Sequence, residues 1–289
     1  MTRRLTLLLA TIAFAVTAQA TTPLTQSDST SNPMPAVELP ADDQGDDKYE
    51  WDFWWEAGAN IASNYLWRGY DQSYTGNMFD PSIQPSVTLG YGMFYVDLWL
   101  NVSPMSTYQE FDMTLGFDYE NLSITVYDVW CGMGADFWKG DFLDGSNHSL
   151  TATVDYTFFD RLRLHWGTTF LHSADWLYNE DGSRKRRAFS SYFEIAYTQP
   201  VKELFDIEFV AGASPWTGPF WCAGKRTLVD GAYELDFENL PQGFNVTNLN
   251  VTLSREFEVG CATFPVSVGY TYNPTTDRHY ALIKAGVSF

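Results

Sequence analysis

In the stretch "SIQPSVTLGYGMFYVDLWLNVS" at 82–103, apolar side chains recur at every second position on either side of a glycine. One face carries Ile83, Pro85, Val87, Leu89, Tyr91, Phe94, Val96, Leu98, Leu100 and Val102. The opposite face carries Ser82, Gln84, Ser86, Thr88, Gly90, Tyr95, Asp97, Trp99, Asn101 and Ser103. This alternation predicts two antiparallel strands with one apolar and one polar face.

The same pattern continues along the chain and predicts about twelve strands. They lie near 54–67, 82–91, 93–103, 109–119, 121–130, 147–158, 161–172, 188–198, 204–213, 244–255, 263–272 and 279–289. Longer or more polar gaps at 68–81, 104–108, 131–146, 173–187, 214–243 and 273–278 alternate with short ones, of which 256–262 is the exception. Short turns at one end and long extracellular loops at the other are typical of an all-β, antiparallel outer-membrane barrel.

Two other arrangements fit parts of the pattern. A soluble β-sandwich also alternates, but large apolar groups along nearly every strand, with aromatic residues near the strand ends, favour a lipid-facing band. Asp230-Gly231 within the 214–243 gap predicts a tight hairpin. We expect this hairpin to project above the membrane, and a spanning hairpin would make fourteen strands.

The last strand, "HYALIKAGVSF", ends at Phe289, with Ala281, Ile283, Ala285 and Val287 on the same face. A final amphipathic strand ending in phenylalanine resembles the signal that the barrel-assembly machinery reads. As the last strand of a barrel it must pair with the first, because an open edge cannot face lipid.

The N-terminal segment predicts export. Residues 1–20 have a basic start, an apolar run and small residues before a cut after Ala20, as in a cleaved signal peptide. Residues 21–50 are acidic and rich in Ser, Thr and Pro, which predicts a disordered leader, with a lumen plug as the alternative. The barrel would then occupy 51–289, with both termini in the periplasm of a Gram-negative-type cell.

Composition excludes several functions. The formal net charge of −19 disfavours a nucleic-acid partner, since phosphate binding needs a basic face. Cys131, Cys222 and Cys261 are widely spaced, so a zinc site is not indicated and no cofactor is expected. Cys131 and Cys222 both fall in extracellular gaps, where a disulfide between them is geometrically open, and Cys261 would be left over.

Strand parity predicts an acid-rich lumen. The candidate residues of the lumen and ion path are Arg68, Asp97, Glu110, Asp112, Asp155, Arg163, Glu194, Asp206, Glu208 and Lys284. Glu56, Asn60, Asn64, Asp118 and His165 share the inward parity. These charges would either form ion pairs that rigidify the barrel or line a path for cations and polar solutes, because carboxylates lower the barrier for positive ions.

Three features lie outside the lumen. His148 and His172 fall on the outward parity with Ser191 on the next strand, which allows a lipid hydrolase as a third reading. We expect no catalytic residue there, because membrane-interface histidines are the commoner case. The basic run Arg184, Lys185, Arg186 and Arg187 predicts a contact with lipopolysaccharide phosphates, against the default of a solvated loop.

The segment "ASNYLWRGYDQS", with the two strands that follow it, resembles the opening of the TorF-like porin family of bacterial outer-membrane proteins. Its pattern S-x-Y-x-x-R-G-x-x-x-S is filled by Ser63, Tyr65, Arg68, Gly69 and Ser73. The resemblance covers about 57–103 and implies an outer-membrane barrel with a pore. It implies no substrate and no functional residue.

We therefore expect an outer-membrane barrel that passes small polar or cationic solutes. The alternative is a non-conducting barrel that acts as a structural, adhesion or assembly scaffold through its loops. Parity places Tyr65 and Trp67 outward in an aromatic girdle and Arg68 inward at the mouth of the lumen.

Overall fold

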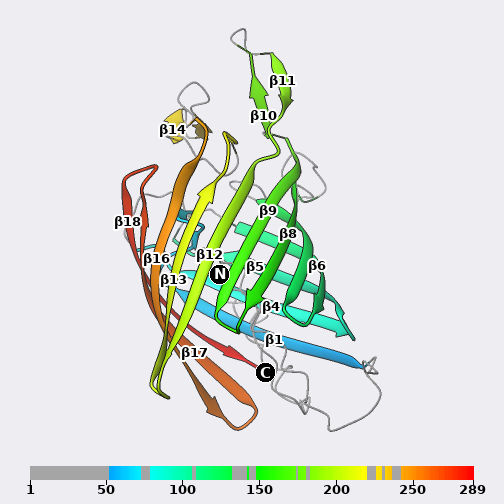
Figure 1. The fold of residues 1–289 in the computed structure, drawn as a ribbon, viewed down its shortest axis with the longest axis vertical. Coiled ribbons are helices and arrows are strands. Elements are labelled where there is room, and N and C mark those ends of the chain that lie inside the picture. The colour runs from blue at the N-terminus through cyan, green and yellow to red at the C-terminus, as the bar shows by residue number, and fades with distance from the viewer. Residues whose placement is uncertain are drawn as a thin grey trace, which may run out of the picture.

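The computed structural model shows a closed barrel with hairpins above one end (Figure 1). It describes residues 52–72, 79–105, 109–131, 142, 148–173, 175–179, 183–219, 226–229, 232–235 and 242–289. The predicted signal peptide and leader lie outside these ranges. Within them, no helix is long and apolar enough to cross a membrane.

Twelve antiparallel strands form the ring. They are β1 (Phe53–Ala62), β4 (Ser82–Tyr91), β5 (Phe94–Val102), β6 (Gln109–Tyr119), β7 (Leu122–Cys131), β8 (His148–Phe158), β9 (Leu162–His172), β12 (Ser191–Val201), β13 (Phe205–Ser214), β16 (Asn245–Val259), β17 (Ala262–Asn273) and β18 (Arg278–Ser288). Neighbours in sequence pair in the ring, and β1 pairs with both β4 and β18. The predicted closed barrel of twelve strands is confirmed.

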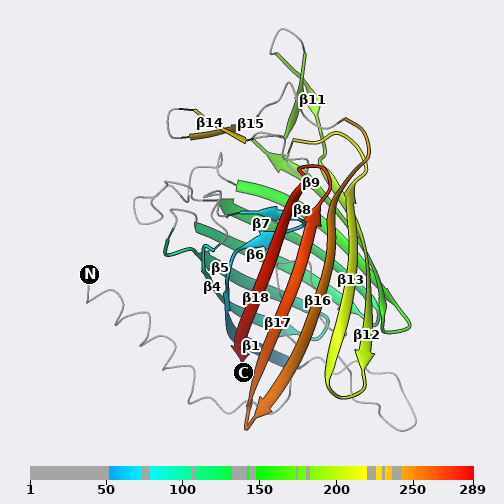
Figure 2. The same ribbon diagram turned by 90° about the vertical axis from the view of Figure 1, so that its left-hand side faces the viewer.

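Three short hairpins stand apart from the ring. They are β2 (Leu66–Trp67) with β3 (Tyr70–Asp71), β10 (Trp176–Tyr178) with β11 (Arg184–Arg187), and β14 (Arg226–Val229) with β15 (Ala232–Leu235). The β14–β15 hairpin forms its own two-stranded sheet, so the fourteen-strand alternative is wrong. Figure 2 shows β11 and the β14–β15 pair above the same end of the barrel.

The connections separate by length as the sequence predicts. Short turns link β4–β5, β6–β7, β8–β9, β12–β13 and β16–β17, and the longer connections lie at the other end. The predicted gap at 256–262 is wrong, because β16 continues to Val259 and only Gly260 and Cys261 form the turn. Gly260 has a φ of 68°, which suits the tight reversal.

The final strand closes the ring through its backbone. Gly58 is paired with Ser288, and the amide of Phe289 donates to the carbonyl of Ala57 at 3.0 Å. Every strand of the ring therefore has two neighbours, which removes the open edge.

The two faces of the wall differ as parity predicts. On β5, Phe94, Val96 and Leu98 are exposed on the outside, while Asp97 and Asn101 are buried on the inside. Exposed aromatic side chains also gather next to the short turns, at Tyr91, Phe94, Tyr119, Phe158, Phe205 and Phe264. An apolar outer band with aromatic residues along its edge at the short turns is a surface suited to contact with hydrocarbon.

Large aromatic residues on the inner face lie over glycines of neighbouring strands. A Cβ added to Gly116 would be 1.9 Å from Cζ of Tyr95, its cross-strand partner. One added to Gly212 would be 1.9 Å from the hydroxyl of Tyr192. These rings occupy space that only glycine leaves free, so they lie along the wall.

This packing predicts that Gly116→Ala destabilises the barrel. We expect the free energy of unfolding to fall by about 1–3 kcal/mol, because the buried Tyr95 ring must move. Urea unfolding of detergent-refolded protein measures the loss. Tyr95→Leu in the Gly116→Ala background should recover part of it, and strictly additive losses would contradict the packing.

Candidate functional site

A short hairpin after β1 folds into the barrel and crosses it. β2 and β3 pair through Leu66 with Asp71 and Trp67 with Tyr70, leaving Arg68 and Gly69 at the tip. β1 and β9 are six positions apart in either direction around the ring of twelve. Since Arg68 reaches His165 on β9, the hairpin spans the lumen from one wall to the opposite wall.

Local sequence explains the tip. Arg68 and Gly69 have φ angles of 49° and 86°, as in the two-residue turns that join closely paired strands. An added Cβ on Gly69 would lie 1.9 Å from the carbonyl oxygen of Thr247, so the tip touches the wall at β16. The side-chain amide of Asn273 on β17 donates from Nδ2 to the carbonyl of Gly69 at 2.9 Å.

Arg68 is the charged group of the tip. Its Nη2 lies 2.8 Å from Nε2 of His165, and its Cζ lies 4.6 Å from the ring centre of Tyr192 and 4.8 Å from that of Trp67. Arginine only donates, so Nε2 of His165 accepts. His165 then carries its proton on Nδ1 and donates to Asp155, at 2.9 Å from both carboxylate oxygens.

Tyr65 anchors the start of the hairpin on the wall formed by β5 and β6. It is only 1% exposed, its hydroxyl donates to Oε1 of Glu110 at 2.7 Å, and its ring centre lies 5.4 Å from that of Trp99. Tyr65 lies outside the barrel strands. Burial, with the nearby Glu110, raises its pKa well above the usual value, so the phenol remains a donor.

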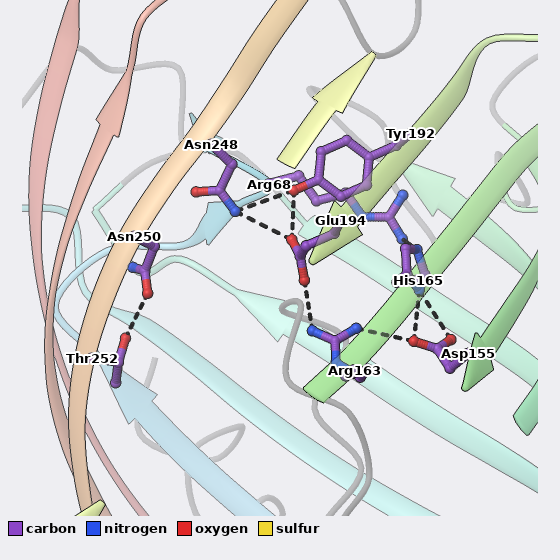
Figure 3. Close-up of polar contacts among 9 residues, drawn as sticks. All are labelled: Arg68, Asp155, Arg163, His165, Tyr192, Glu194, Asn248, Asn250 and Thr252. Carbon is purple, nitrogen blue, oxygen red and sulfur yellow. Dashed lines mark hydrogen bonds and ion pairs between the residues drawn. The ribbon is translucent and has the colours of Figure 1, made fainter. Parts of the chain in front are cut away.

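Arg163 holds an ion-pair network on β8, β9 and β12 (Figure 3). It is 4% exposed and contacts Asp155 at 3.0 Å and Glu194 at 2.6 Å. Oε2 of Glu194 accepts from Tyr192 at 2.5 Å and from the amide of Asn248 on β16 at 3.3 Å. The network therefore connects the charged groups of Asp155, Arg163 and Glu194 to Tyr192, whose ring contacts Arg68.

Nine of the ten predicted lumen residues lie on ring strands at positions that alternate with the exposed outer side chains, and Arg68 lies at the tip of the hairpin. The structure brings Arg68, Asp155, Arg163 and Glu194 into one connected cluster through His165 and Tyr192. The other predicted residues lie on separate strands of the same face: Asp97 on β5, Glu110 and Asp112 on β6, Asp206 and Glu208 on β13, and Lys284 on β18. Asp97 accepts a hydrogen bond from Thr88 at 2.7 Å.

The predicted placement of Tyr65 and Trp67 in an outward girdle is wrong. The predicted first strand, 54–67, ends at Ala62, and the chain then turns inward, so strand parity no longer applies. Both rings belong instead to a cluster with Trp99 inside the barrel. Sequence reasoning also missed Tyr192, Asn248 and Asn273, whose roles depend on contacts between distant strands.

At the rim where the hydrolase reading placed a Ser/His pair, His148 and Ser191 have hydrogen-bond partners other than each other. Nδ1 of His148 lies 2.7 Å from Asp128 and its Nε2 lies 2.6 Å from the carbonyl of Phe142. The Ser191 hydroxyl lies 2.8 Å from that of Thr168. The register of β8 and β9 shifts between Leu150 and Thr151, and His172 pairs with the inward-facing Ser149, which corrects its predicted outward position.

Two other predicted sites are the disulfide between Cys131 and Cys222 and the basic run at 184–187, and the structure describes only the second in full. The disulfide remains a prediction, because Cys222 lies outside the described residues. Arg184, Lys185, Arg186 and Arg187 form β11 in a hairpin above the barrel. Within the described ranges, no group of three or more His, Cys, Asp or Glu side chains is arranged to hold a metal ion.

Solved structures that resemble this chain do so at low sequence identity and low TM-score. No family model matches the chain. No curated protein matches it either. An outer membrane channel from Pseudomonas putida F1 aligns with 85% of this chain and 99% of its own at 9% identity and a TM-score of 0.38. The high-pH structure of Pseudomonas putida OprB aligns over 83% and 94% at 10% identity and a TM-score of 0.35.

The Arg163 network predicts a large effect of removing its cation. We expect Arg163→Met to lower the free energy of unfolding by about 3 kcal/mol, because two carboxylates in a buried setting lose their partner. Urea unfolding of the refolded barrel measures this. Arg161→Met, an exposed neighbour in the β8–β9 turn, should change stability by no more than about 0.5 kcal/mol. Equal effects of the two variants would refute the assignment.

Proposed function

We propose that this protein is a bacterial outer-membrane channel whose lumen is narrowed by the β2–β3 hairpin. The observation that carries the proposal is the contrast between an apolar outer face and a charged inner face on a closed ring of twelve strands. An interior lined by Asp97, Glu110 and Glu194 suits water and ions rather than lipid.

The size of the lumen supports narrowing by the hairpin. Twelve strands about 4.8 Å apart and tilted about 40° give a cylinder roughly 24 Å across its backbone. Side chains on both walls leave on the order of 10 Å. A hairpin with contacts on β6, β9, β16 and β17 divides that space. Only small solutes fit such a path.

Charge favours cations and polar solutes. Carboxylates outnumber cationic groups among the predicted lumen residues, and they occupy β5, β6, β8, β12 and β13. Carboxylates around a water-filled path lower the electrostatic barrier for positive ions. Arg68, at the tip of the hairpin and against His165 and Tyr192 of the wall, would oppose the entry of multiply charged cations.

A non-conducting scaffold is the second candidate. The same hairpin and the Arg163 network favour it, since both fill the lumen with paired groups. The loops and hairpins at one end of the barrel would then carry the function (Figure 2). Passage of ions through the purified protein separates the two candidates.

The proposed location follows from export by a signal peptide, with both termini in the periplasm. The long loops would face outward, and Phe289 would serve the barrel-assembly machinery. The resemblance of 57–103 to the TorF-like porin family agrees with this location. Urea extraction and fractionation of membranes from the native host would test it.

Planar bilayers provide the direct test of conduction. We expect small conductance steps and a reversal potential that favours cations. Asp206→Asn with Glu208→Gln should lower the cation-to-anion permeability ratio about twofold, since charges about 10 Å apart in water interact by about 0.4 kcal/mol. Glu203→Gln, in the turn before β13, is the matched control and should leave the ratio unchanged. Absence of steps from folded protein would exclude the channel.

The hairpin predicts a second change in conductance. Replacing residues 66–71 with a short Gly-Ser linker should raise single-channel conductance at least about twofold, because the central obstruction is removed. Arg68→Ala should raise it less and shift selectivity further toward cations. Unchanged conductance in both variants would show that the hairpin does not limit the path.

A further inference from the structure

The β10–β11 hairpin is a compact basic surface on an acidic protein. Its second strand consists of four consecutive cationic residues, out of 17 Lys and Arg in a chain of net charge −19. Arg184, Lys185 and Arg186 are exposed. Figure 1 shows the hairpin rising above the barrel beyond β9 and β12, clear of the ring.

Two of the arginines are held in place by an aromatic ring. Cζ of Arg187 lies 4.4 Å from the ring centre of Trp176, and Cζ of Arg184 lies 4.9 Å from it. Arg187 also donates to the carbonyl of His172 at 2.7 Å. Stacking orders the guanidinium groups before a partner arrives, which reduces the entropy lost on binding.

Three acidic residues belong to this segment: Asp175 at its base is directed away from the basic surface, and Glu180 and Asp181 between the two strands lie outside the described residues. Asp175 is fully buried and accepts from the Ser190 hydroxyl at 2.5 Å and from the Ser190 amide at 3.3 Å. Its amide donates to the carbonyl of His172 at 3.2 Å. Asp175 therefore fixes the hairpin to the barrel rim.

Below the hairpin, the outer face is apolar. Trp166, Phe170 and Leu171 on β9 are exposed, and so are Phe189 and Trp216 beside them. The ring centres of Trp166 and Trp216 are 5.7 Å apart, and Nε1 of Trp216 donates to the carbonyl of Phe189 at 3.0 Å. A basic surface thus lies above an apolar surface on one side of the barrel.

We propose that this side of the barrel binds lipopolysaccharide, with the lipid phosphates on Arg184, Lys185 and Arg186 and the acyl chains on the β9 surface. Guanidinium groups suit phosphate because they donate paired, charge-assisted hydrogen bonds. An anionic, acylated glycolipid matches both surfaces at once. This inference rests on the proposed outer-membrane location but does not require an open lumen.

The test compares two charge reversals of the same kind at opposite ends of the barrel. Lys185→Glu with Arg186→Glu changes the hairpin, while Arg161→Glu with Lys202→Glu changes exposed cations at the short turns. Binding of purified lipopolysaccharide to the folded protein in detergent is measured for each. We expect the hairpin variant to bind about tenfold more weakly and the control to match the unchanged protein. Heat-modifiable electrophoretic mobility verifies folding, and Lys185→Gln alone replaces the double variant if that variant does not fold.

Three further ligands identify what is recognised. Lipopolysaccharide stripped of its lipid phosphates should bind as weakly as the hairpin variant, and phosphatidylglycerol at equal mole fraction should bind more weakly than intact lipopolysaccharide. Millimolar inorganic phosphate should not displace it. Unchanged binding of lipopolysaccharide by the hairpin variant would overturn the proposal. So would binding of dephosphorylated lipopolysaccharide or phosphatidylglycerol as tight as that of intact lipopolysaccharide, or displacement of lipopolysaccharide by inorganic phosphate. Because binding is measured without a bilayer, a failure here is distinct from a failure to conduct.

Discussion

Backbone hydrogen bonds between β1 and β18 close the ring, and the rest of the structure depends on that closure. Peptide groups on an open edge would lack partners in hydrocarbon. Once the pairing is closed, a slip of one residue in any strand would exchange its two faces. The pairing of Ala57 with Phe289 and of Gly58 with Ser288 therefore fixes a polar lumen as well as an edge-free wall.

A ring of twelve strands leaves a space that wall side chains alone do not fill. The β2–β3 hairpin lies in that space, and its polar contacts join Tyr65 to Glu110, Arg68 to His165, and the side-chain amide of Asn273 to the carbonyl of Gly69. Each buried polar group needs such a partner. The hairpin is thus positioned by hydrogen bonds to several strands, whereas the ring is held by its own ladder.

Much of this architecture could be predicted from period-two alternation, which indicated about twelve strands, with fourteen left open, and the inward direction of Asp97 and Arg163. Alternation holds only while the chain stays in the ladder. It fails after Ala62, where the chain turns inward, and near His172, where a register shift moves the side chain to the other face. The contact between Arg68 and His165 joins residues 97 positions apart, for which the local sequence carries no signal.

The hairpin depends on the ring for its position, whereas closure of the ring does not depend on the hairpin. The ring has a complete set of paired strands without β2 and β3, so closure does not require the hairpin. Placing Arg68 at 6% exposure removes water from a guanidinium group, which is unfavourable unless ring stacking and hydrogen bonds offset it. The residues that supply this offset, His165 and Tyr192, are tied through Asp155 and Glu194 to Arg163. The charges on the wall and the position of the hairpin are thus one coupled system, and a change in either alters the width and the charge of the lumen together.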